Sequence, residues 1–175
     1  MADVVLVDKN DNEIGLLEKV KAHLNGGNLH RAFTIFIFDK NGKTLIAQRS
    51  IKKMLWPLYW DSACASHPVQ NEGYVEAGKR RLLEELGFLC DLEVIDRFEY
   101  KEKYQNLGSE NEVCTTLIGY FNGDIHPVSD EVADYKWISI GNLKKDMVKN
   151  PNKYAIWFKI ALDRLIDQGK IKQES

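Results

Sequence analysis

The chain has 175 residues, 44% of them hydrophobic, which is enough to fill the core of one domain spanning residues 1–175. Its 24 basic and 26 acidic residues give a net charge of −2, so nothing favours a nucleic acid or an anionic membrane as partner. There is no apolar run of transmembrane length and no signal-peptide pattern, and three scattered cysteines without a CxxC motif indicate a reduced, cytoplasmic protein.

The N-terminal third is predicted to hold three strands and one helix. Residues 3–7 form a short strand, and residues 16–24 form a helix that ends at the breaker Asn25-Gly26-Gly27. The apolar residues 32–38 and the segment 44–48 flank Asn41-Gly42, a dipeptide typical of tight hairpin turns. We therefore expect these two segments to pair as antiparallel strands.

The middle of the chain, residues 56–88, is predicted to be a Trp-Pro loop followed by a helix that carries Glu72 and ends at Gly87. After it the sequence predicts one or two strands, two further strands, two helices and a frayed tail, at residues 92–104, 110–120, 134–138, 142–148, 151–165 and 169–175. Strands with few helices between them indicate an α+β fold, with a mixed sheet between helices.

The predicted central helix is densely charged. Arg81 and Glu85 lie four residues apart and share one face, and Arg80 and Glu84 form a neighbouring pair. Carboxylates hold hard cations and arginines hold phosphate oxygens in a fork, so this helix suits a metal-bound polyphosphate. A solvated helix laced with salt bridges explains the same residues equally well.

Two further groups of residues have metal-ligand chemistry. Glu110 and Glu112 are two apart on a predicted strand, so both carboxylates point to one face and can converge on a cation. Taken locally, a solvent-facing strand with two glutamates is the simpler interpretation. Each of the four histidines, taken alone, is expected to be structural or exposed; they are His23, His30, His67 and His126.

The segment from Ser66 to Phe88 resembles the Nudix box, G-x5-E-x7-R-E-U-x-E-E-x-G-U. The matching residues are Ser66-x5-Glu72-x7-Arg80-Arg81-Leu82-x-Glu84-Glu85-x-Gly87-Phe88. Two positions depart from the box, because Ser66 replaces a glycine and Arg81 replaces a glutamate. Nudix hydrolases use that glutamate as a metal ligand, so Arg81 argues against a diphosphate hydrolase. The resemblance implies a Nudix-type fold.

Arginine at this position is typical of the type 1 isopentenyl-diphosphate isomerases, which belong to the same superfamily. Four further motifs of this chain are similar to theirs, in the same order and over residues 19–157: Leu29-His30-Arg31-Ala32-Phe33, Trp56-Pro57-Leu58-Tyr59-Trp60, Ser66-His67-Pro68 and Glu110-Asn111-Glu112-Val113-Cys114. The spacing of seven between His23 and His30 also matches.

The resemblance implies two cation sites and a prenyl diphosphate as substrate. A divalent metal (Mg²⁺, Mn²⁺ or Zn²⁺) would be held by His23, His30, His67, Glu110 and Glu112, while His126 has no counterpart and is expected at the surface. The substrate diphosphate would bind Lys19, Arg49, Lys53 and Arg81, with Glu85 holding a Mg²⁺ that bridges to the phosphates. We expect a monomer or a weak homodimer.

The implied reaction moves a carbon–carbon double bond through a carbocation-like species, so it needs proton-transfer groups on two sides and an aromatic face. Glu112 and Tyr100 match the family's group on one side, and Trp157 matches the aromatic residue. On the other side the family has a cysteine where this chain has Ala65. Cys64 stands one residue too early and is expected to point to the opposite side.

Three interpretations stay open at this point. The first is an isopentenyl-diphosphate isomerase impaired by Ala65, and the second is a Nudix diphosphate hydrolase that keeps Glu72, Glu84 and Glu85. The third is a non-catalytic protein that binds prenyl diphosphates. Phosphate release would identify the second, and proton exchange between isopentenyl diphosphate and deuterated water would separate the first from the third.

Overall fold

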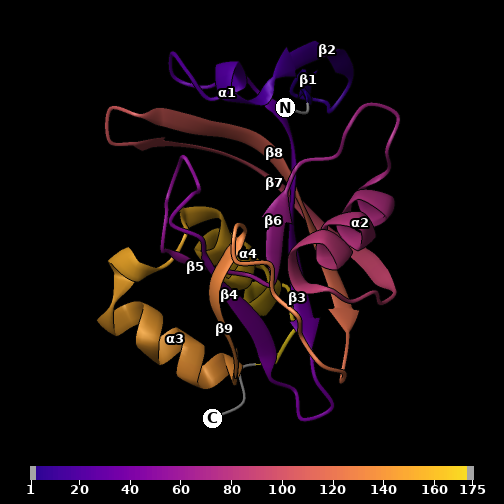
Figure 1. Cartoon of the computed structure of the whole chain (residues 1–175), viewed down its shortest axis with the longest axis vertical. Coiled ribbons are helices and arrows are strands. Elements are labelled where there is room, and N and C mark those ends of the chain that lie inside the picture. Colours follow the sequence, from indigo (N-terminus) through magenta and orange to yellow (C-terminus); the bar gives the residue numbers. More distant parts are fainter. Residues whose placement is uncertain (1–2, 173–175) are drawn as a thin grey trace.

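The structure is a computed structural model that describes residues 3–172, and Figure 1 shows its arrangement. Within this range one mixed sheet is covered by helices. Its strands are β1 (Asp3–Val7), β2 (Glu13–Glu18), β3 (His30–Phe38), β4 (Thr44–Arg49), β5 (Trp60–Asp61), β6 (Cys64–Ser66), β7 (Leu92–Tyr104), β8 (Gly108–Tyr120) and β9 (Val132–Ile138). The helices are α1 (Lys19–Ala22), α2 (Tyr74–Leu86), α3 (Ile140–Lys149), the 3-10 turn η1 (Pro151–Lys153) and α4 (Ile156–Asp167).

Strand β3 is the centre of the sheet. It runs parallel to β8 along its whole length and pairs antiparallel with β1, β4 and β6 over shorter stretches. Eight of its nine residues are buried, as expected for a strand covered on both faces, which needs a continuous apolar run rather than alternation. β7 extends the sheet beyond β8, and β9 extends it beyond β4.

The side chains of β3 alternate between two hydrophobic clusters, one on each face of the sheet. Phe36 and Phe38 face the cluster formed with α3 and α4, whereas Ile35 and Ile37 face the cluster formed with α2. In Figure 1, α2 and α4 accordingly lie on opposite faces of the sheet. The predicted α+β fold, a mixed sheet between helices, is confirmed.

The helix predicted over residues 16–24 is wrong. Residues Glu13–Glu18 form β2, which pairs with β1, and only Lys19–Ala22 are helical. The turn before β2 explains the outcome, because the Asp8 carboxylate accepts the backbone N–H groups of Asn10 and Asn12. This turn folds the chain back onto β1, and strand pairing overrides the weak helical pattern.

Two further helix predictions need correction. Glu72 precedes α2 rather than lying on it, and its carboxylate accepts the Val69 N–H at 3.0 Å. The predicted helix 151–165 is interrupted, because Tyr154 and Ala155 are extended between η1 and α4. Their backbone pairs with Trp60 instead, and the Ala155 N–H donates to the Trp60 carbonyl at 2.9 Å.

The short strands β5 and β6 were not predicted, whereas the other predicted elements have small boundary errors. The hairpin turn at Asn41-Gly42 is confirmed, with Gly42 at φ 73°, a conformation that favours glycine. Residues 92–104 form one strand, and α2 ends at Gly87 with φ 75°, as predicted. The frayed tail was predicted for residues 169–175, of which 173–175 lie outside the described residues. Across residues 3–172, the helices are too short and too polar to cross a bilayer.

Candidate active site

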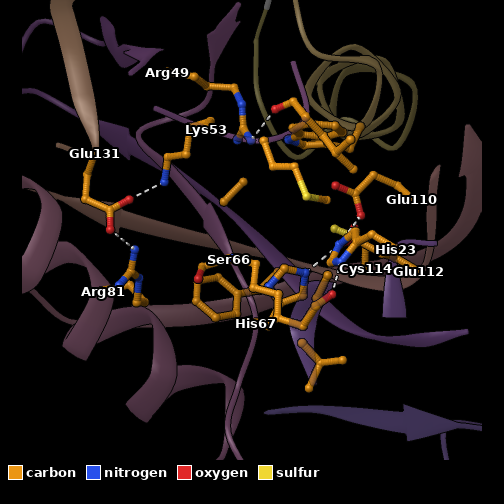
Figure 2. A pocket seen from close by; sticks show the side chains of 18 of the residues that line it. His23, Arg49, Lys53, Ser66, His67, Arg81, Glu110, Glu112, Cys114 and Glu131 are labelled. Carbon is orange, nitrogen blue, oxygen red and sulfur yellow. Dashed lines mark hydrogen bonds and ion pairs between the residues drawn. The ribbon is translucent and has the colours of Figure 1, made fainter. Parts of the chain in front are cut away.

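A cavity of about 440 Å³ opens between β3, β8, the loop after β4 and the start of α4, which is a typical size for a small-ligand site (Figure 2). Most of the predicted site residues line it, namely Lys19, His23, Arg49, Lys53, Ala65, His67, Arg81, Tyr100, Glu110, Glu112 and Trp157. His30 lies beneath the cavity floor and is fully buried. Glu85 lines a small adjoining recess together with Lys53 and Ala65.

The strand register places one histidine and two acid–base groups in a row across the sheet. His30 on β3 is the register partner of Glu112 on β8, which in turn pairs with Tyr100 on β7. The Tyr100 hydroxyl donates to Glu112 Oε2 at 2.5 Å. Glu110 lies two residues from Glu112 and therefore on the same face of β8.

His23 lies near Glu110 and Glu112 because the turn that carries it is hydrogen-bonded to the start of β8. The Ser109 N–H donates to the His23 carbonyl at 2.8 Å, and Asn111 Nδ2 donates to the Gly27 carbonyl at 3.2 Å. Gly27 has φ 76°, and a Cβ there would lie 3.0 Å from Asn111 Cβ and from Ser109 O. Glycine at this position allows the close approach that brings His23 to Glu110.

His23, His30, His67, Glu110 and Glu112 form a compact group whose ligand atoms all lie within 4.8 Å of one another. Two of the histidines have an assigned tautomer. His23 Nδ1 lies 2.6 Å from the Lys19 carbonyl oxygen, and His30 Nδ1 lies 2.7 Å from that of Asn28. Because a carbonyl only accepts, the proton is on Nδ1, and each Nε2 presents a lone pair to the centre of the group.

The lone pairs face carboxylate oxygens, which is unfavourable without a cation between them. His23 Nε2 is 2.8 Å from Glu110 Oε2, yet that oxygen has no hydrogen-bond partner, and neither has His30 Nε2. Both atoms are buried, so bulk water does not compensate them. The five residues therefore fit a divalent cation, which binds imidazole nitrogen together with carboxylate oxygen.

The titration behaviour of His67, Glu112 and Tyr100 agrees with this fit, whereas His23 differs, because burial lowers its pKa but the adjacent Glu110 carboxylate raises it above the ordinary value. Burial and the neighbouring Lys19 charge hold the pKa of His67 well below its ordinary value, so its imidazole is neutral at pH 7. Burial alone would raise the pKa of Glu112, but contacts with His30 and Tyr100 lower it. Burial and the Glu112 charge raise the pKa of Tyr100 well above its ordinary value. Neutral imidazole and ionised carboxylate are the forms that bind metals.

Three of the four predicted phosphate-binding cations are already partnered by protein oxygens. Arg49 donates to the carbonyls of Leu55 and Trp56, each at 3.0 Å, so the Trp-Pro loop fixes its guanidinium. Arg81 donates to Glu85 Oε1 through Nε at 3.0 Å and Nη2 at 2.5 Å. The partner of Lys53 is Glu131, which the sequence did not point to.

Comparison with known proteins identifies the family of the chain. The NUDIX domain family matches residues 28–158, which is most of the chain. Isopentenyl-diphosphate Delta-isomerase of Haloarcula marismortui is 41% identical, with 93% of this chain and 90% of the relative covered. The enzyme of the same name from Burkholderia multivorans is 37% identical, with 92% and 91% covered.

The chain belongs to the isopentenyl-diphosphate Delta-isomerase family, within the Nudix superfamily. Solved structures agree on the fold. DR0079 from Deinococcus radiodurans superposes with a TM-score of 0.77 over 94% of this chain and 99% of its own, at 16% identity. A NUDIX hydrolase from Nitrosomonas europaea gives a TM-score of 0.60, also at 16% identity, with 83% of this chain and 92% of its own covered.

Ala65, the position that the family resemblance assigns to a cysteine, lines the cavity from β6. Cys64 lies on the opposite face, in the cluster beneath α2, as the alternation of an extended segment predicts. Its thiol donates to Glu85 Oε1 at 3.4 Å, and burial together with the Glu85 charge raises its pKa well above the ordinary value. Cys64 is therefore held as a neutral thiol away from the cavity.

Asp61 is a site residue that the sequence analysis missed. The Trp157 indole N–H lies 2.9 and 3.0 Å from its two carboxylate oxygens, and Arg49 Nη1 lies 3.3 Å from one of them. Arg49 also stacks over the Trp157 ring, 5.1 Å from the centroid. Burial raises the pKa of Asp61, and the Arg49 charge acts against it. Its one sequence signal is an acidic residue directly after the W-P-x-x-W motif.

Replacing Asp61 with asparagine is expected to lower the free energy of unfolding by about 1–3 kcal/mol, because it removes the charge partner of the partly buried Arg49. Urea unfolding of the variant measures this loss. The matched control is Asp91→Asn, whose ion pair with Lys79 is on the surface, and which should unfold like the unmodified chain. Equal stability of the two variants would contradict the role given to Asp61.

Proposed function

We propose that the chain binds isopentenyl diphosphate and converts it to dimethylallyl diphosphate by protonation and deprotonation, as a step of isoprenoid biosynthesis, and that Ala65 slows this reaction. One observation carries the proposal. A single cavity holds a metal-ligand group, a hydrogen-bonded Tyr100–Glu112 pair and a cluster of cations. The names of its relatives support the same reaction.

The diphosphate binds at the end of the cavity where the cations gather, through Lys19, Arg49, Lys53 and Arg81. Arginine forks and lysine ammonium groups both suit phosphate oxygens. Glu85 lies beside Arg81 and would supply a carboxylate for a substrate-bound Mg²⁺, which proteins commonly hold through one or two carboxylates together with the phosphates. This arrangement leaves the hydrocarbon part of the substrate facing Trp157 and the Tyr100–Glu112 pair.

Proton transfer begins at the Tyr100–Glu112 pair. The proton held between the Tyr100 hydroxyl and the Glu112 carboxylate passes to the terminal alkene carbon, and the positive charge that develops on the tertiary carbon faces the Trp157 ring. A divalent cation held by the His/Glu group would supply positive charge that stabilises Glu112 as a carboxylate. The second proton has to pass to water, because Ala65 offers a methyl group where a thiolate would accept it. The chain therefore has the first half of the acid–base machinery and lacks a group for the second.

One observation, Ala65 itself, favours a second candidate, a protein that binds prenyl diphosphates without turnover. A Nudix hydrolase activity is disfavoured, because the position of a metal-binding glutamate is occupied by Arg81, which donates to Glu84 and Glu85. Incubation with isopentenyl diphosphate in deuterated water tests the proposal. Slow incorporation of deuterium supports it, whereas binding without any incorporation favours the second candidate, and release of phosphate favours a hydrolase.

Binding of isopentenyl or dimethylallyl diphosphate is expected to require Mg²⁺. The ligand brings two phosphoryl groups beside Glu85, and only a cation between them turns this repulsion into attraction. Calorimetry with and without a chelator measures how the affinity for the diphosphate depends on Mg²⁺. In the Glu85→Gln variant this Mg²⁺ dependence should disappear. Equal affinity in the two conditions would contradict the role proposed for Glu85.

A further inference from the structure

Glu131 lies between two of the cations proposed to hold the diphosphate. Figure 2 shows its carboxylate reaching Lys53 with one oxygen and Arg81 with the other. Oε2 contacts Lys53 Nζ, and Oε1 is 3.3 Å from Arg81 Nη2. The contacts of the two carboxylate oxygens are those that two phosphate oxygens would make.

The backbone holds Glu131 in place independently of its side chain. The Ser50 N–H donates to the Glu131 carbonyl at 3.0 Å, and the Glu131 N–H donates to the Val128 carbonyl at 2.9 Å. Val128 is in turn fastened to α2, because its N–H donates to the Glu85 carbonyl at 2.9 Å. A change of the side chain at position 131 therefore alters the charge at the cavity and leaves these three bonds intact.

The ion pairs of Glu131 are shielded more than those of its neighbour. Lys53 and Glu131 have side chains that are 19% and 31% exposed, whereas the adjacent pair, Lys52 and Asp130, is 62% and 66% exposed. Shielded pairs are less weakened by solvent. Burial alone would raise the pKa of Glu131, but Lys53 and Arg81 lower it, so the carboxylate is ionised at neutral pH.

We propose that Glu131 is an internal stand-in for the substrate's phosphate, which an incoming diphosphate must displace, and that it thereby sets the selectivity of the site. This inference rests on the proposed function, because it needs Lys53 and Arg81 to bind the diphosphate. A ligand must replace two ion pairs at once to remove Glu131. A diphosphate can span both cations with its two phosphoryl groups, whereas a single phosphate reaches fewer of them.

Removal of the Glu131 charge should therefore strengthen anion binding. The displaced contacts are two partly shielded ion pairs, so Glu131→Gln should raise the affinity for inorganic pyrophosphate about five- to tenfold, which corresponds to about 1.0–1.4 kcal/mol. Orthophosphate should gain at least as much, so that the preference for the diphosphate does not increase. Asp91→Asn is the control, because Asp91 pairs with Lys79 on the surface and neither residue lines the cavity, and it should leave both affinities unchanged.

The experiment is calorimetry of the full chain with pyrophosphate and with orthophosphate, at one fixed excess of Mg²⁺ for the unmodified chain and every variant. Unchanged or weaker pyrophosphate binding by Glu131→Gln overturns the inference, and so does an equal gain in Asp91→Asn. Glu131→Asp retains the charge on a shorter side chain and should show a smaller increase in pyrophosphate affinity than Glu131→Gln. It gives a second measurement if the glutamine variant does not fold.

The failure of this inference can be told apart from that of the proposed function. If the unmodified chain binds pyrophosphate and Glu131→Gln binds it no better, the diphosphate site stands and the stand-in role is wrong. If the unmodified chain binds neither pyrophosphate nor isopentenyl diphosphate, with Mg²⁺ or without it, the basic residues Lys19, Arg49, Lys53 and Arg81 do not form a phosphate site. Both proposals are then overturned together.

Discussion

Replacing Ala65 with cysteine is expected to raise the rate of isomerisation by at least about a hundredfold, the lower end of the effect of one positioned acid–base group. Ala65 lines the cavity from β6, where its strand partner is Thr34 on β3, so the new thiol would enter the cavity that the Tyr100–Glu112 pair also lines. Methyl and thiol differ little in size, so substrate affinity should hardly change. Deuterium incorporation into isopentenyl diphosphate gives the rate, and calorimetry gives the affinity.

The neighbouring cysteine provides the control. Cys64 is buried beneath α2 with its thiol on Glu85, so Ala65→Cys combined with Cys64→Ala should match the single Ala65→Cys variant. Cys64→Ala alone should leave the slow isomerisation rate of the unmodified chain unchanged. If the unmodified chain is a robust isomerase and Cys64→Ala abolishes that activity, Cys64 is the acid–base group and the assignment of position 65 is wrong.

Local patterns predicted the elements that depend on local chemistry. The Asn41-Gly42 turn is set by the left-handed backbone that glycine permits, and α2 ends at Gly87 for the same reason. The central strand β3 was visible as a continuous apolar run, because it is covered on both faces. At these positions the residues of one short segment determine the local structure, so the sequence alone is enough to predict it.

The errors occurred where pairing with another segment decides the local structure. Residues 13–18 form a strand because the turn at Asp8 returns them to the nearby strand β1, so the error there was to follow a weak helical pattern instead of the turn. Helix 151–165 is interrupted because the backbone of Ala155 pairs with Trp60, which lies far earlier in the chain and outside any local window. Propensity is a weak guide when a tertiary hydrogen bond competes with a helical one.

The residues of the candidate site also fall into two groups: those that the sequence identified and those that only the structure identifies. The motif histidines and glutamates could be assigned from family resemblance, and the fold brings all five of them into one group. Asp61 and Glu131 were missed because their importance comes from contacts across the fold, to Trp157 and to Lys53. Neither residue belongs to a motif with a stated function, so only the geometry identifies it.

Removal of divalent metal is expected to lower the melting temperature of the chain by roughly 8–16 °C, provided the metal is present at about a thousandfold excess over its Kd. Such binding stabilises the folded state by about 4 kcal/mol, and one kcal/mol shifts the melting temperature of a chain of this size by about 2–4 °C. Without the cation, Glu110 and Glu112 lie buried on one face of β8 with histidine lone pairs against them. Thermal melts with and without a chelator measure the shift.

Three variants separate the metal site from the acid–base pair that shares Glu112. Glu112→Gln should lose both bound metal and activity, whereas Tyr100→Phe removes only the phenol that donates to Glu112 and should retain the metal while reacting more slowly. His126→Ala changes an exposed histidine outside the group and should alter neither. Elemental analysis should find about one divalent ion per folded chain, as a single His/Glu group implies. A folded chain that stays metal-free after divalent ions are added would show that the five residues are held together by hydrogen bonds alone.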